Sequence, residues 1–304
     1  MKGLIKLNFE IEVLIISFAI SIILSMMTIP ILKKLKVGQI ERDDGPASHL
    51  KKQGTPTMGG IIIIIGMIIA TIATAIYLYA TGDERLAKDL LPILLLTIGF
   101  GAIGFIDDYK KLVLKNTDGL KPSYKMLGLL VISVAYVLYL VQGLKLGTDT
   151  YIPILKIYVT LPMYIYIPAA ICVILATTNA VNLTDGIDGL SSSISTIIIT
   201  CLTVIGMLQG ITEVSVFGSI VIGSVLGFLI FNLHPAKIFM GDTGSLLLGG
   251  VISGMALYLK MPLILLVIAL IPVLETLSVI MQVMYFKKTG KRIFKMAPLH
   301  HHFE

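Results

Sequence analysis

Long apolar blocks alternate with short polar segments along the whole 304-residue chain. Most blocks are about 17–23 residues long, the length an α-helix needs to cross a hydrocarbon core of roughly 30 Å. Strands of an outer-membrane barrel would instead alternate apolar and polar positions. The pattern therefore predicts an all-α integral membrane protein, a polytopic helical bundle. Its nine spans are expected at residues 11–32, 59–80, 90–106, 127–144, 163–180, 190–208, 214–231, 245–259 and 262–286.

Composition supports the same class. Hydrophobic residues make up 56% of the chain and charged residues 14%, which is too much apolar surface for a water-soluble globule of this size. The formal net charge of +6 does not indicate nucleic acid as a partner, because the basic residues lie between apolar blocks and form no basic domain or arm. We therefore expect one transmembrane domain over residues 1–304, with the lipid bilayer as its surroundings.

Lysine and arginine are distributed unevenly between the two sides of the predicted bundle. Of the 24 basic residues, 17 fall on the side that holds loops 33–58, 107–126, 181–189, 232–244 and 287–304. Cytoplasmic loops carry such an excess, so this side is predicted to face the cytoplasm. On the other side, β-branched and aromatic residues at 148–160 favour a short β-hairpin, in which Pro153 is confined to an edge.

Several aspartates lie close to span ends on the predicted cytoplasmic side. Asp107 and Asp108 directly follow the apolar run that ends at Ile106. Two adjacent acids at a helix C-terminus are disfavoured by the macrodipole and by each other. Their charge is useful if a cation lies nearby or if one of them acts as a base. The alternative is an interfacial helix end whose charge is balanced by Lys110 and Lys111.

A second cluster lies in the stretch 179–190. Asp185 and Asp188 are three positions apart, and Gly186 and Gly189 give a backbone that can approach a ligand closely. The turn is similar to an oxygen-ligand loop, although it lacks the full EF-hand pattern. The alternative is a tight turn in which Asp188 caps a helix that starts near Leu190.

A third cluster surrounds Asp242. Asp242, Thr243 and Ser245 lie at the start of a span, where free backbone N–H groups and the positive helix end can hold phosphate. Asp242 would bring Mg²⁺ to that phosphate, because this ion prefers one or two carboxylates together with phosphate and water oxygens. Phe239 can stack on a base. The alternative for Asp242 is a plain N-cap, which leaves the flanking glycines unexplained.

Three other features are candidates for function. The imidazoles of residues 300–302 can donate hydrogen bonds to phosphate or bind a metal, although consecutive helical residues point in different directions. Lys52 precedes a Gly-Thr-Pro-Thr turn that ends at Thr57, an arrangement that suits phosphate or base contacts. Glu275 lies inside the last apolar block, where an ionisable group is either functional or a neutral acid bonded to a neighbouring helix. Pro272 favours a bend there.

Together these stretches resemble the polyprenyl-phosphate N-acetylhexosamine-1-phosphate transferase superfamily, along essentially the whole chain. Asp107 with Asp108, residues 179–190 and residues 240–244 look like superfamily signatures. Residues 52–60 and 298–304 resemble its phospho-N-acetylmuramoyl-pentapeptide transferase branch. The resemblance implies Mg²⁺-dependent transfer of phospho-N-acetylmuramoyl-pentapeptide from UDP to undecaprenyl phosphate. The products would be lipid I and UMP, in peptidoglycan biosynthesis at the bacterial cell membrane.

The same resemblance implies roles for individual residues. Asp242 would bind Mg²⁺, and Asp107 and Asp108 would serve the lipid phosphate, one of them as a base. The nucleotide pocket would be lined by Lys52, Thr57, Asn182, Asp185, Asp188, Asn232 and Phe239. Phosphates or the peptide sugar would be held by Lys111, Lys125, His300, His301 and His302. The resemblance also implies a cytoplasmic active-site cleft, a tenth span after Glu304, and an arrangement that allows a homodimer.

Two other functions remain open at this point. A sibling transferase that uses UDP-N-acetylglucosamine would share the aspartates, but it is expected to lack a stretch like residues 298–304. A cation-coupled transporter would use Glu275 and the helix-end aspartates as an ion path. It predicts acids near the membrane midplane, whereas all of these acids except Glu275 fall at one predicted interface.

Overall fold

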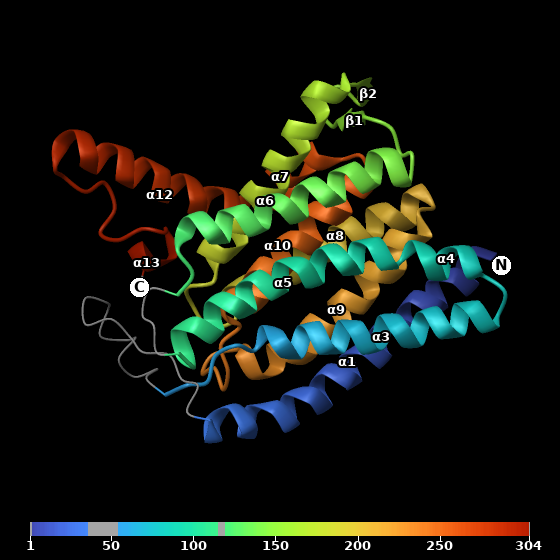
Figure 1. The fold of residues 1–304 in the computed structure, drawn as a ribbon, viewed down its shortest axis with the longest axis horizontal. Helices are drawn as coiled ribbons and strands as arrows, with labels where there is room; N and C mark the ends of the chain where they lie inside the picture. Colours follow the sequence, from blue (N-terminus) through green and yellow to red (C-terminus); the bar gives the residue numbers. More distant parts are fainter. Residues whose placement is uncertain (1, 36–53, 115–118, 304) are drawn as a thin grey trace.

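The computed structural model describes residues 2–35, 54–114 and 119–303, mostly as helices (Figure 1). Two short strands, β1 (Asp149–Ile152) and β2 (Ile157–Thr160), complete it. The helices are α1 (Lys2–Lys34), α3 (Gly60–Ala80), α4 (Glu84–Asp89), α5 (Leu91–Leu112), α6 (Pro122–Leu138), η1 (Tyr139–Gly143), α7 (Met163–Thr184), α8 (Leu190–Gln209), α9 (Thr212–Asn232), α10 (Gly241–Tyr258), η2 (Pro262–Ile264), α11 (Leu265–Ile268), α12 (Leu270–Thr289) and α13 (His300–Phe303).

Within the described part of the chain, eight helices are long and apolar enough to cross a membrane. They correspond to every predicted span except 245–259, and the predicted polytopic helical bundle is confirmed. The span predicted at 262–286 is wrong in one respect, because it is broken into η2, α11 and α12. Pro272 explains the break: it has no N–H to donate to the carbonyl of Ile268, and its ring clashes with that carbonyl.

Helix α10 lies at the centre of the bundle and is less apolar because protein surrounds it. Every residue from Thr243 to Tyr258 is buried. A Cβ on Gly249 would overlap the backbone of Thr178 in α7, so the two helices pack backbone to backbone at this point. Small residues allow such close packing between membrane helices. A helix that contacts other helices in place of lipid does not need a strongly apolar composition.

Helices α1 and α9 are joined by small and hydroxyl side chains. Ser17 Oγ donates to the carbonyl of Ile220 at 2.6 Å, and Ser21 Oγ donates to the carbonyl of Ser224 at 2.7 Å. A Cβ on Gly223 would overlap the backbone of α1. These contacts place α1 along one side of the bundle, where α3 also packs.

The predicted β-hairpin is confirmed. Strands β1 and β2 are antiparallel, with Asp149 opposite Thr160 and Ile152 opposite Ile157, and Pro153 lies outside both strands. Lys260, which follows α10, fixes the hairpin to the bundle. Its carbonyl accepts a hydrogen bond from Tyr151 N at 2.8 Å, and its Nζ lies 2.9 Å from Asp149 Oδ2.

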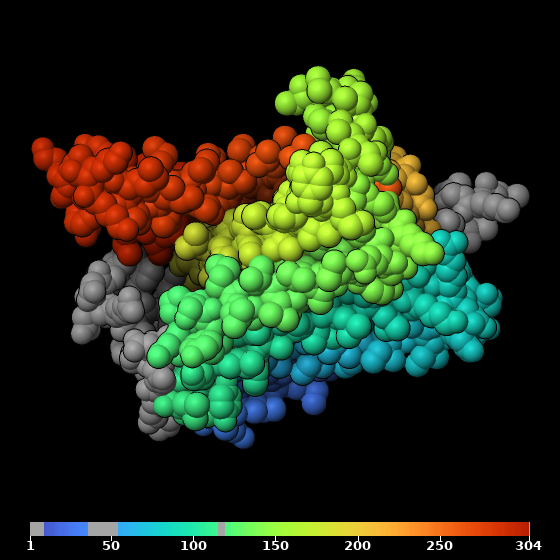
Figure 2. Space-filling model, turned by 45° about the horizontal axis from the view of Figure 1, so that its top comes forward, coloured from blue at the N-terminus to red at the C-terminus, as the bar shows by residue number. Residues whose placement is uncertain are grey.

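The segments that carry the predicted site residues meet at the opposite end of the bundle from the hairpin. In Figure 1 the end of α5, the starts of α3 and α6, the end of α7 and helix α13 all lie on the left. Figure 2 shows the α12 region, in red, standing out from the body of the molecule. Many apolar side chains of α12 are accordingly exposed, among them Leu274, Leu277 and Met281.

Candidate active site

Glycines bring the functional ends of α3, α5 and α10 together. A Cβ on Gly104 of α5 would overlap the backbone carbonyl of Asp242 in α10. A Cβ on Gly60 of α3 would overlap the backbone of Gly244. Any larger side chain at either position would force two helices apart. The glycines therefore permit the C-terminal half of α5 and the start of α3 to reach the first turn of α10.

Three carboxylates converge at this junction. Asp107 and Asp108 are 2% and 5% exposed, and one ligand atom from each of these acids and from Asp242 lies within 4.8 Å of the others. Such a cluster is stable only if positive charge lies close to it. Lys111 Nζ lies 2.6 Å from Asp107 Oδ2 and 3.1 Å from Asp242 Oδ2. Lys125 Nζ lies 2.8 Å from the same Asp242 oxygen and 3.8 Å from Asp107 Oδ2.

Asp108 caps helix α10 from outside. Its Oδ1 accepts a hydrogen bond from Asp242 N at 3.1 Å, and its Oδ2 accepts from Thr243 N at 2.9 Å and from Thr243 Oγ1 at 2.6 Å. A negative charge at a helix N-terminus is favourable, and these donors have no partner inside the helix. From the sequence, these N–H groups were expected to bind phosphate. In the structure they donate hydrogen bonds to Asp108.

The end of α7 supplies two polar side chains to the same junction. Asn182 Nδ2 donates to Asp242 Oδ1 and to Ser245 Oγ, both at 2.8 Å. Asp185 is the residue after α7 and is partly buried. Desolvation raises the pKa of the Asp185 carboxyl to about 8, and the charges of Asp242 and Asp108 act in the same direction. An acid that is neutral near pH 7 can donate a hydrogen bond.

Asp188 and Asn232 shape the loop between α9 and α10. Asp188 Oδ2 accepts from Ala236 N at 3.2 Å and lies 3.0 Å from His234 Nδ1. Asn232 Nδ2 donates to the carbonyl of Ile238 at 2.9 Å, and Asn232 is 3% exposed. Helix α8 begins at Leu190 with Gly189 as its cap residue and has no side-chain cap, so the interpretation of Asp188 as its cap is wrong.

Thr57 and Phe239 come together from distant parts of the chain. Phe239 N donates to the carbonyl of Pro56 at 2.8 Å, and Gly59 N donates to the carbonyl of Phe239 at 2.9 Å. Thr57 is 7% exposed and lies beside Gly241 at the start of α10. Lys52, the other predicted residue of this segment, lies outside the described residues.

The histidine segment, residues 291–303, packs against α12. Glu275 Oε2 accepts a hydrogen bond from His300 N at 3.2 Å and lies 3.2 Å from His300 Nδ1. Glu275 is thus bonded to a neighbouring segment, one of the two interpretations of its position. His301 and His302 are partly exposed, and Lys295 N donates to His302 Nδ1 at 3.1 Å.

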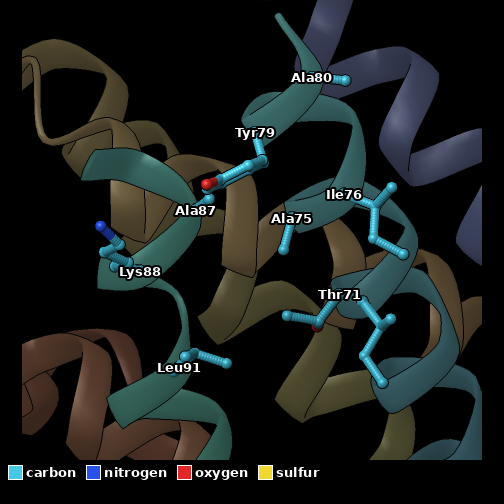
Figure 3. A pocket seen from close by; sticks show the side chains of 9 residues that line it. Thr71, Ala75, Ile76, Tyr79, Ala80, Ala87, Lys88 and Leu91 are labelled. Atoms are coloured by element: carbon cyan, nitrogen blue, oxygen red, sulfur yellow. The ribbon is translucent and has the colours of Figure 1, made fainter. Parts of the chain in front are cut away.

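A cavity of about 320 Å³ opens beside the acid cluster. Four polar and four apolar residues line it. The lining residues are Asp107, Lys111, Leu120, Pro122, Lys125, Met126, Leu129 and Asn179. A larger cavity of about 420 Å³ lies between α3, α4 and α5, away from these acids (Figure 3). Lys88 is the one charged residue that lines it, so the smaller cavity is the better candidate for a site of chemistry.

Comparison with known proteins agrees with the motifs. Residues 90–260, from the start of α5 to the end of α10, match glycosyl transferase family 4, and residues 52–64 match phospho-N-acetylmuramoyl-pentapeptide-transferase signature 1. The phospho-N-acetylmuramoyl-pentapeptide-transferase of Acetivibrio thermocellus is 48% identical over 294 residues, which are 96% of this chain and 86% of that protein. Proteins of the same name from Halalkalibacterium halodurans and Clostridium botulinum strain Alaska E43 are 46% and 49% identical, again over 96% of this chain and over 87% and 86% of theirs.

This chain belongs to the phospho-N-acetylmuramoyl-pentapeptide-transferase family. The resemblance carried by its motifs is thereby confirmed. The chain is a multi-pass membrane transferase, and the transporter alternative is wrong.

In this member of the phospho-N-acetylmuramoyl-pentapeptide-transferase family, the structure gathers most predicted site residues into one region. Asp107, Asp108, Asp242, Lys111, Lys125 and Asn182 are linked by direct contacts. Sequence reasoning missed Asn179, which lines the cavity one helical turn before Asn182, and Ser245 as a partner of Asn182. Asn179 could have been found from its spacing, because it lies one helical turn from Asn182. No local signal shows which distant side chain Ser245 would meet.

Proposed function

We propose that this cleft transfers phospho-N-acetylmuramoyl-pentapeptide from UDP to undecaprenyl phosphate, forming lipid I and UMP in peptidoglycan biosynthesis. The observation that carries the proposal is the convergence of three carboxylates and two lysines beside a cavity that is lined by both polar and apolar side chains. The choice of the muramoyl donor rests on the signature at residues 52–64 and on the names of the relatives.

The acid cluster fits Mg²⁺. Its donors are all carboxylate oxygens, which this hard cation prefers, and they lie within 4.8 Å of one another. Asp242 is the ligand we assign, because its side chain is partly exposed. Asp108 and Asn182 also hold in place the first turn of α10, on which Asp242 lies. Mg²⁺ held there would neutralise charge on the pyrophosphate of the donor.

The acceptor is assigned to the cavity lined by Asp107. Lys111 and Lys125 would hold its phosphate, and Met126 and Leu129 would contact the first isoprene units of the lipid. A phosphate monoester, with a second pKa of about 6, is largely ionised at neutral pH and needs little help from a base. Positioning and charge neutralisation then supply most of the catalysis, as in other phosphoryl transfers.

The donor is assigned to the neighbouring loops. Asn182, Asp185 and Asp188, with Asn232 supporting the loop that carries Phe239, would surround the nucleotide together with Thr57 and Lys52. His301 and His302 are partly exposed and would contact the phosphates or the peptide sugar. We place this site on the cytoplasmic side of the bacterial inner membrane, within one transferase domain over residues 1–304. The excess of basic residues on these loops supports that side, and the exposed apolar surface of α12 is compatible with a homodimer.

The test is UMP release by the purified protein in detergent with UDP-N-acetylmuramoyl-pentapeptide, undecaprenyl phosphate and Mg²⁺. We expect release that depends on the metal, that Asp242→Ala abolishes, and that Asp149→Ala in the distant hairpin leaves intact. No release by the unaltered protein would refute the proposal. Competition by UDP-N-acetylglucosamine tests the sibling donor, and turnover of that nucleotide in preference to the muramoyl donor would overturn the assignment.

A further inference from the structure

The histidine segment is tied to α12 at two points on one face of that helix. Gln282 Oε1 accepts hydrogen bonds from Ile293 N at 2.9 Å and from Phe294 N at 3.0 Å. Glu275, about two helical turns earlier, accepts from His300 N at 3.2 Å. Side chains two turns apart share a face, so the histidine segment runs back along one face of α12.

The contact between Glu275 and His300 is buried. The two side chains are 6% and 4% exposed, and Glu275 Oε2 lies 3.2 Å from His300 Nδ1. A carboxyl group inside an apolar helix is costly unless it is hydrogen-bonded, and His300 supplies its backbone N–H as a donor to Glu275.

The far edge of the His300 ring meets Gly186. A Cβ on Gly186 would overlap Nε2, Cε1 and Cδ2 of that ring. Gly186 lies between Asp185 and Asp188 in the loop that joins α7 to α8. The absence of a side chain at Gly186 therefore lets the ring pack directly on the loop backbone. Contacts run without interruption from Glu275 in α12, through His300, to the loop.

We propose that Glu275 is a positioning residue, which through His300 holds the Gly186 loop and its two aspartates at the transfer site. This inference rests on the proposed function, since that function assigns the loop to the nucleotide of the donor. His300 then acts on the donor through the loop and does not touch it. Loss of Glu275 should weaken donor binding more than it slows the transfer step.

A double-mutant cycle tests whether Glu275 acts through His300. We expect Glu275→Gln and His300→Ala each to raise the donor KM about tenfold, a typical effect of losing a residue that orients a ligand-holding group, with a smaller change in kcat. The double variant should be no worse than His300→Ala alone. Thr276→Val is the matched control, because Thr276 lies on the same helix and its hydroxyl donates to the carbonyl of Pro272 within that helix; it should leave both constants unchanged. If the two single increases in the donor KM multiply in the double variant, the proposal is overturned.

A rescue experiment tests the contact with the loop, even if Glu275→Gln fails to fold. Gly186→Ala should lower the melting temperature and raise the donor KM, because the new methyl group displaces the His300 ring. Removing that ring in the double variant Gly186→Ala/His300→Ala should bring the melting temperature and the donor KM part of the way back to the values of the unaltered protein. A double variant that is worse than Gly186→Ala would overturn the proposal. Melting temperatures need no substrate, so they remain informative if the unaltered protein releases no UMP, an outcome that would refute the proposed function and not this contact.

Discussion

Asp108→Asn separates the role of Asp108 in holding α10 from any role in chemistry. Asparagine keeps one acceptor oxygen and places an NH2 group where the other oxygen was. Either Asp242 N or the two donors of Thr243 then lose their acceptor. The change also removes a negative charge from the start of a helix.

The magnitude follows from these contacts. A buried donor left without an acceptor costs about 1–3 kcal/mol, and the lost charge at the helix N-terminus costs about 1 kcal/mol. Removing one of three clustered carboxylates relieves repulsion with Asp107 and Asp242 and offsets part of this loss. We expect a net destabilisation of about 2 kcal/mol, which lowers the melting temperature by roughly 3 °C in a chain of 304 residues.

The assay is thermal unfolding in detergent, followed by circular dichroism. Intrinsic tryptophan fluorescence cannot serve, since the chain contains no tryptophan. Melting in EDTA, without substrates, removes any contribution from a bound cation. Asp149→Asn in the hairpin is melted in parallel at about pH 7 as a comparison, and it should lower the melting temperature by less than Asp108→Asn does. If Asp108→Asn melts within a degree of the unaltered protein while UMP release is lost, Asp108 does not hold α10 and the reasoning is refuted.

Three other predictions follow from single contacts. Gly104→Ala places a methyl group on the carbonyl of Asp242 and separates α5 from α10, so UMP release should fall about a hundredfold or more, and near-normal release would contradict the packing. Asp185→Asn should melt higher than the unaltered protein in EDTA, by more at about pH 9 than at about pH 5. The folded pKa of about 8 lies above the ordinary value of this acid, so its ionisation opposes folding progressively as the pH rises through that window; a difference independent of pH would refute this. The Thr160 hydroxyl and Lys260 lower the pKa of Asp149, so the small stabilisation from this exposed acid is present above its ordinary pKa and is lost on acidification. Asp149→Asn should accordingly lower the melting temperature slightly at neutral pH and not at about pH 3, with UMP release unchanged.

The sequence by itself determined the membrane class, the positions of most spans, the hairpin and the side on which the acids gather. These features are local, because span length is set by bilayer thickness and the loops between spans are marked by charge, glycine and proline. The break near Ile268 was partly foreseeable from Pro272, although a run of apolar residues continues through it. The acids of the cluster were also found from sequence, since each follows or precedes an apolar run, whereas Lys111 and Lys125 were named as site residues only by the resemblance to the transferase superfamily.

Only the tertiary structure decided which of these residues meet. Asp108 and Thr243 are distant in sequence, and nothing local to either one shows that a carboxylate at the end of α5 caps α10. The central place of α10 likewise depends on glycines that face backbones of other helices, whereas apolar patterning reports contact with lipid more directly than contact with protein. The same holds for Glu275, whose sequence position allowed an ion path or a buried bond. Packing of α13 against α12 placed His300 between that acid and Gly186.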